Sequence, residues 1–122
     1  MGYAVRSSVD TEKEKLIAKM REILQKWNGT MKVSGQYPGW QYNPDSKLRE
    51  DMIEVFERLY GRKPVVEAIH AGVECGLFAE KMEGLDCVSI GPDMDDIHTT
   101  EERMSISSVK RVWEFLLEVL KK

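Results

Sequence analysis

Apolar positions repeat with helical spacing in three long segments of the chain, residues 9–29, 43–61 and 105–122. The first segment begins with Thr11 and Glu14, a pair that fits a capping box. A shorter helix is expected over 74–82. The positions predicted to face a core are Leu16, Ile17, Met20, Ile23, Leu24 and Trp27 in the first segment, Leu48, Met52, Val55, Phe56 and Leu59 in the second, and Val109, Val112, Trp113, Leu116 and Leu120 in the third.

Four other segments have the composition of β-strands, namely 3–9, 30–40, 64–72 and 85–92. The last two are dense apolar runs, which suits strands covered on both faces. From residue 43 onward the predicted order is helix, strand, helix, strand, helix, which is typical of an α/β fold with parallel strands. Residues 1–42 instead predict strand, helix, strand. We therefore expect two parts, 1–42 and 43–122.

The composition and the absence of common motifs limit the classes of function that the chain can be expected to have. The chain has 122 residues, 42% of them hydrophobic and 32% charged, which indicates one modest globular domain. The formal charge is -3 without a basic stripe, so nucleic acid is not an expected partner. No apolar run approaches the ~20 residues that span a bilayer, so no membrane association is expected. HExxH, GxSxG, Walker A and GxGxxG motifs are absent from the sequence.

His70 lies at the carboxyl end of one predicted buried strand, and His98 lies in the loop after the other; in open α/β sheets ligand sites form at the carboxyl ends of strands. His98 ends the acidic stretch 93–98, where an imidazole can bind metal with nearby carboxylates. A lone histidine in an acidic loop is also common on plain surfaces. A catalytic zinc usually has three protein ligands, so co-ligands of His98 would have to come from elsewhere.

Four further residues have both a structural and a functional interpretation. His70 ends a predicted strand and is either a hydrogen-bonded structural residue or part of a site. Gly72 either makes a turn or allows close backbone approach to a ligand. Glu74 begins a helix, where a negative charge is stabilising by itself. Arg6 is either a solvated side chain or a guanidinium fork that holds a carboxylate.

Four segments, taken in order, resemble the C-terminal part of one enzyme family. They are VRSSVD, GQYPGWQYNPDS, IHAGVECGLF and VSIGPDMDDIHTTEERMSISSV. The chain from Val5 to about Leu117 is similar to aminoacyl-histidine dipeptidases, also called Xaa-His or cytosol non-specific dipeptidases. The combination of the HAGVECGLF and SIGP…H…E motifs is specific to that family.

The resemblance implies a cytoplasmic metallopeptidase that hydrolyses Xaa-His and other dipeptides with water activated by two zinc ions. It implies that residues 1–42 end a lid domain and that 43–122 form the C-terminal part of the catalytic domain. By this resemblance His98 is a metal ligand and Arg6 meets the substrate carboxylate. His70, Gly72 and Glu74 lie beside the substrate pocket.

The family's other metal ligands and its general base have no counterpart in this sequence. The resemblance therefore predicts a fragment that contains no catalytic residue, binds zinc weakly or not at all, and is inactive alone. The alternative is a non-catalytic interaction module that dimerises or complements a separate N-terminal half. Unpaired strand edges would favour such association.

Overall fold

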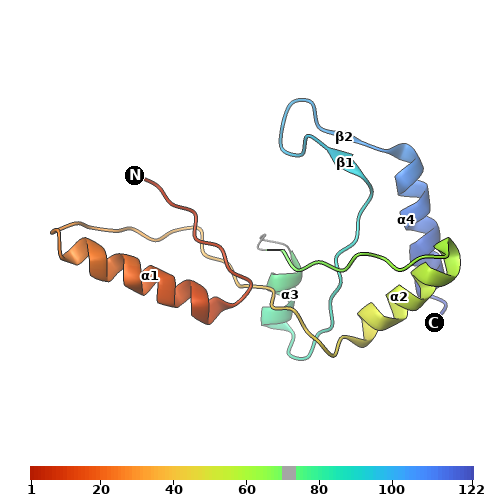
Figure 1. Cartoon of the computed structure of the whole chain (residues 1–122), viewed down its shortest axis with the longest axis horizontal. Coiled ribbons are helices and arrows are strands. Elements are labelled where there is room, and N and C mark those ends of the chain that lie inside the picture. The colour runs from red at the N-terminus through yellow and green to blue at the C-terminus, as the bar shows by residue number, and fades with distance from the viewer. Residues whose placement is uncertain (70–73) are drawn as a thin grey trace. The chain divides into compact units, whose positions relative to one another are not determined.

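The computed structural model describes residues 1–69 and 74–122, which form four α-helices and one short β-hairpin (Figure 1). The chain divides into two compact units. The first unit comprises Met1–Pro44 and Glu67–Leu85, and the second comprises Asp45–Val66 and Asp86–Lys122. No helix in the described ranges is both long enough and apolar enough to cross a membrane.

The second unit is built on two packed helices, α2 (Lys47–Tyr60) and α4 (Ile106–Val119). Its buried core consists of Met52, Val55 and Phe115, and the partly buried Leu48, Phe56, Val88 and Val119 pack around it. The Phe115 ring meets the Phe56 ring edge to face, with centroids 5.8 Å apart. Polar contacts at the helix ends add to this small core.

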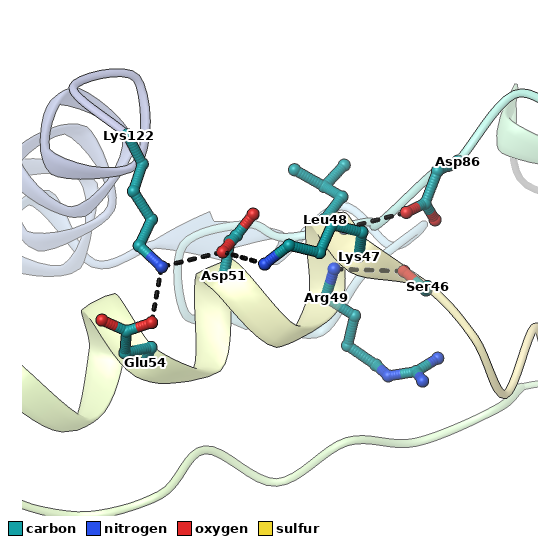
Figure 2. A network of polar contacts seen from close by, with 8 residues as sticks. All are labelled: Ser46, Lys47, Leu48, Arg49, Asp51, Glu54, Asp86 and Lys122. Carbon is teal, nitrogen blue, oxygen red and sulfur yellow. Dashed lines mark hydrogen bonds and ion pairs between the residues drawn. The ribbon is translucent and has the colours of Figure 1, made fainter.

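Helix α2 is capped at both ends, as Figure 2 shows for its first turn. Ser46 accepts the Arg49 N–H at 3.1 Å, and the Asp86 carboxylate accepts the Leu48 N–H at 2.8 Å from a segment 38 residues away. Together they satisfy two of the four backbone donors that a helix start leaves unpaired. Gly61 closes the helix with a left-handed φ of 65°, which glycine adopts without a steric penalty.

The hairpin consists of β1 (Met94–Asp95) and β2 (Arg103–Met104), which pair antiparallel. In this register Met94 lies opposite Met104, and Asp95 lies opposite Arg103. The Ser105 N–H donates to the Asp93 carbonyl at 3.0 Å, so the hairpin closes one residue beyond the strands. Ser105 is also the N-cap of α4, and this shared residue fixes the hairpin on the helix.

The first unit contains α1 (Asp10–Gln25) and α3 (Glu74–Lys81) and is held by close contacts between backbones. A Cβ atom added at Gly39 would lie 2.5 Å from the Ser8 carbonyl oxygen, and one added at Gly76 would lie 3.0 Å from that of Pro38. The segment around Pro38 and Gly39 therefore touches both the chain before α1 and the start of α3.

Asp10 is the polar centre of the first unit. Its carboxylate accepts the Gly39 N–H at 2.9 Å and the Lys13 ammonium at 2.6 Å. Lys13 in turn donates to the Tyr37 carbonyl at 2.7 Å. The Lys13 contact, followed by the Gly39 N–H, lowers the pKa of Asp10 below its ordinary 3.8.

The four predicted helices are confirmed, but the start of α1 differs from the prediction. The helix begins at Asp10, and its N-cap Val9 makes no side-chain capping bond. Thr11 therefore lies inside the first turn, and the capping box predicted for Thr11 and Glu14 is wrong. The carboxylate of Asp10 is used in contacts to Lys13 and Gly39 instead.

The predicted buried face is confirmed for α2, where Met52 and Val55 are buried, and is wrong for α1 and α4. Within the described residues, α1 buries none of its side chains. Helix α4 buries Ser108 and Phe115, whereas Trp113 of the predicted face is 59% exposed. A helical stripe is buried only where another element covers it. Helix α4 carries two apolar stripes, and α2 covers the one that contains Phe115.

The predicted strands and the element order built on them are wrong for this chain by itself. The residues described over 3–9, 30–40, 64–69 and 85–92 form no strand, while residues 70–72 lie outside the described ranges. A strand requires a partner for its backbone N–H and C=O groups, and these segments do not pair with one another. The assignment of 1–42 to a lid and 43–122 to a catalytic domain stays a prediction.

Candidate metal-ligand loop

His98 lies in the connection between β1 and β2, and its side chain is exposed. Its φ is +67°, and that of Asp96 in the same loop is +51°. Left-handed backbone is uncommon for residues other than glycine and needs support from surrounding contacts. The His98 N–H donates to a Glu102 carboxylate oxygen at 2.7 Å.

The rest of the loop is closed by short-range polar contacts. The Asp96 carbonyl accepts both the Thr99 N–H at 3.1 Å and the Thr99 hydroxyl at 2.7 Å. Arg103 forms an ion pair with Asp96, and its Nε lies 3.4 Å from a carboxylate oxygen of Asp95. These bonds join the two sides of the loop, so its shape is defined by contacts within residues 95–103.

The base of the hairpin is fixed separately on α4. The Asp93 N–H donates to the Ser108 hydroxyl at 2.9 Å, and the Asp93 carboxylate pairs with Arg111 at 3.0 Å. The Ser108 hydroxyl itself donates to the Ser105 carbonyl at 2.7 Å. Ser108 is buried, and its position on α4 therefore sets where the hairpin starts.

The described residues do not form a complete metal site. No group of three or more His, Cys, Asp or Glu side chains among residues 1–69 and 74–122 is arranged to hold a metal ion. Of the carboxylates near His98 in the sequence, Asp95 and Asp96 bind Arg103 and Glu102 binds the His98 backbone, whereas Glu101 belongs to no metal-holding group of the described residues. The second unit thus presents one exposed imidazole without co-ligands.

The other candidate residues belong to the first unit or lie outside the described residues. Arg6 is exposed in the segment that precedes α1. Glu74 is the exposed first residue of α3, where its charge faces the positive end of the helix dipole. His70 and Gly72 lie outside the described residues.

The loop contains two further residues that the sequence pattern did not indicate, Glu102 and Arg103. Their sequence signal was weak, because two adjacent charges in an acidic loop are typical of a solvated surface. Once the loop is known to be a hairpin, the opposite charges of Asp95 and Arg103 face each other across the strand pair.

Comparison with known proteins relates the whole chain to peptidases. A model of Peptidase family M20/M25/M40 matches residues 28–122. Over 117 residues, 96% of this chain, it is 34% identical to the cytosol non-specific dipeptidase of Escherichia coli (strain K12). The crystal structure of aminoacylhistidine dipeptidase from Vibrio alginolyticus matches 94% of the chain, with a TM-score of 0.81 and 31% identity.

These matches confirm the predicted resemblance to aminoacyl-histidine dipeptidases. They also show that the helices and hairpin correspond to part of an α/β peptidase fold. The chain spans 24% of the length of each of these two relatives.

Proposed function

The chain belongs to Peptidase family M20/M25/M40, and from this membership we propose that it is part of a metal-dependent dipeptidase. The observation that carries the proposal is 34% identity to a dipeptidase over 96% of the chain. The proposed substrates are Xaa-His and other dipeptides. The proposed location is the cytoplasm, since the relative is described as a cytosol enzyme.

In this proposal His98 is one ligand of a zinc centre whose other ligands lie outside the chain. An exposed imidazole on a loop closed by its own hydrogen bonds suits this role, because a ligand held in place loses little freedom on binding. The described residues supply no co-ligand. We therefore assign no catalytic step to this chain and expect it to be inactive alone.

Arg6 is the proposed anchor for the free carboxylate of the dipeptide. Its planar guanidinium can bind both oxygens of a carboxylate at once. Glu74, His70 and Gly72 are proposed to lie beside the same substrate. Substitution of Arg6 by Lys would keep the positive charge but remove the two parallel N–H donors. In a chimera with the E. coli dipeptidase, the KM for dipeptides should therefore rise more than kcat falls.

A chimera tests the proposal directly. The region of the E. coli dipeptidase that matches this chain would be replaced by the chain, and dipeptide hydrolysis and bound zinc would be measured. The chimera should be active. Loss of a partner that only orients a metal ligand costs about 10- to 100-fold in affinity or activity, so His98→Ala should cost more than about 100-fold. Thr100→Ala, two residues away, is the matched control and should leave both properties unchanged.

Two results would contradict the proposal. A folded chimera whose His98→Ala variant keeps its zinc and activity would remove the ligand role. Turnover by the 122-residue chain alone, abolished by His98→Ala, would refute the expected inactivity. Circular dichroism of each variant separates these outcomes from misfolding.

A second candidate function is that of an interaction module, and the exposed apolar stripe of α4 favours it. The stripe repeats at helical spacing and consists of Ile106, Val109, Trp113, Leu117 and Leu120, which are between 38% and 86% exposed. Such a stripe is typical of a surface that another element covers. Its expected occupant is a second copy or a separate N-terminal half. A clean monomer in sedimentation at high concentration would count against self-association.

A further inference from the structure

Two adjacent residues after His98, Glu102 and Arg103, contact the two left-handed residues of the loop. We propose that Glu102 and Arg103 are positioning residues that fix the backbone conformation of His98. The proposal deepens the proposed function and rests on it, because the position of His98 matters for chemistry only if its imidazole is a ligand.

Glu102 acts on His98 directly. The bond from the His98 N–H to the Glu102 carboxylate is 2.7 Å long, which is short for a nitrogen donor. A charged acceptor makes such a bond stronger than a neutral one. His98 at φ +67° needs this kind of support, since a residue with a Cβ holds left-handed backbone only where its surroundings require it.

Arg103 acts on His98 through Asp96. It lies opposite Asp95 in the strand pair and also forms an ion pair with Asp96, the other left-handed residue. The Asp96 carbonyl receives the two bonds from Thr99, the residue after His98. Arg103 thereby holds the start of the turn from which His98 projects.

The contacts of this pair are separate from those that hold the hairpin on α4. Asp93 is bound by Ser108 and Arg111, and the core around Phe115 lies on the helices. Loss of Glu102 or Arg103 should therefore free the tip of the loop and leave its base and the α2–α4 core unchanged. A residue that merely stabilised the unit would loosen all of these parts together.

The test uses nuclear magnetic resonance on the ¹⁵N-labelled 122-residue chain and needs no metal or substrate. In the unchanged chain His98 should show the strong intraresidue amide–Hα Overhauser effect of a left-handed residue. Because a hydrogen bond to a charged group is among the stronger ones, Glu102→Ala should speed amide exchange at His98 about tenfold or more and weaken that effect. Glu102→Gln keeps a hydrogen-bond acceptor and should restore part of the slow amide exchange and part of the Overhauser effect at His98.

Arg103→Ala should change the amide signals of Asp96 more than those of His98, since the Arg103 side chain acts on His98 indirectly. Glu101→Ala is the matched control, because it makes the same change one residue earlier, at a side chain with no hydrogen-bond or ion-pair partner in the described part of the chain. Its His98 signals should stay unchanged, as should the α2 and α4 amides in every variant.

Three results would overturn the positioning role. They are unchanged amide exchange and Overhauser effect at His98 in Glu102→Ala, the same change at His98 in Glu101→Ala, and amide exchange along α4 that speeds up as much as at His98. Failure of the proposed function looks different. A His98→Ala chimera that keeps its zinc overturns the ligand role, and with it the functional meaning of this contact, whereas an unchanged His98 signal in Glu102→Ala overturns the positioning role alone.

Discussion

The two units of the chain are stabilised in different ways. The second unit has a buried apolar cluster of Met52, Val55 and Phe115 between two capped helices. The first unit is held by the Asp10 contacts and by the close backbone approaches at Gly39 and Gly76, and its longest helix buries no side chain in the part of the chain that the structure describes.

This difference shows which parts of the fold this chain specifies by itself. Where it supplies two apolar faces, as in α2 and α4, a core forms. Where it supplies one face, as in α1, the apolar side chains stay exposed or half-buried and polar contacts set the local shape. The chain spans 24% of the length of each of the two relatives, and nothing within the described residues buries the apolar face of α1.

The largest effect is expected from Phe115→Ala in the second unit. Phe115 is 7% exposed and packs on Met52, Val55 and Phe56. Truncation of a buried Phe costs about 3–5 kcal/mol, and the small size of this cluster favours about 3 kcal/mol. Urea unfolding followed by far-ultraviolet circular dichroism measures the loss.

Trp113→Ala is the matched control on the same helix. Because Trp113 is 59% exposed, its truncation should change the free energy of unfolding by no more than about 0.5 kcal/mol. A cost comparable to that of Phe115→Ala would show that the exposed stripe of α4 is covered in solution. The second unit would then be stabilised by a partner on α4 as well as by its own core.

A smaller effect is expected from Gly39→Ala in the first unit. The new Cβ would lie 2.5 Å from the Ser8 carbonyl oxygen, so the backbone must shift and the Asp10 contact to the Gly39 N–H must lengthen. Overpacking of this kind costs about 1–3 kcal/mol. Amide exchange at Gly39 and along α1 should speed up, while exchange in α2 and α4 stays unchanged.

Gly2→Ala is the control for that change, since a Cβ at position 2 meets nothing within 4 Å. Equal exchange rates in the Gly39→Ala and unchanged chains would mean that the close approach does not hold the first unit together. The contrast between a core-stabilised unit and a contact-stabilised unit would then be lost.

The sequence predicted the helices and the family because both depend on local patterns. Helical spacing located the three long helices, and the buried face of α2 followed from it. The strands could not be predicted reliably, because pairing depends on neighbours outside the segments concerned. The wrong inward face of α4 has the same origin, since two stripes compete and α2 covers the one that contains Phe115 and Val119.

The site was predictable from motif resemblance and much less so from physical reasoning. His98 stood out as a histidine after a predicted strand, and its neighbours identified the family. Its left-handed backbone and its bond to Glu102 could not be foreseen, because strands of only two residues each leave no alternation in the sequence that would predict a hairpin. The Asp10 contact to Gly39 joins residues 29 positions apart, which no local pattern indicates.

The smallest effect is expected from Asp86→Asn, which tests the polar part of the second unit. The Ser46 hydroxyl and then the Leu48 N–H lower the pKa of Asp86 below its ordinary 3.8. A carboxyl whose pKa is lower in the folded state stabilises that state above the unfolded pKa, and the gain disappears as pH falls through the folded pKa. At pH 7 the substitution should cost about 1 kcal/mol, because the amide oxygen keeps the hydrogen bond and loses the charge.

The cost of Asp86→Asn should therefore be constant above about pH 5 and shrink toward zero below pH 4, where the carboxyl of the unchanged chain becomes protonated. Glu101→Gln removes the same charge from a side chain with no hydrogen-bond or ion-pair partner in the described ranges, and should cost little at any pH. Urea unfolding of both variants between pH 3 and pH 7 measures these costs. A cost of Asp86→Asn that does not change with pH would mean that the Asp86 charge does not cap α2, and that the apolar cluster alone distinguishes the second unit from the first.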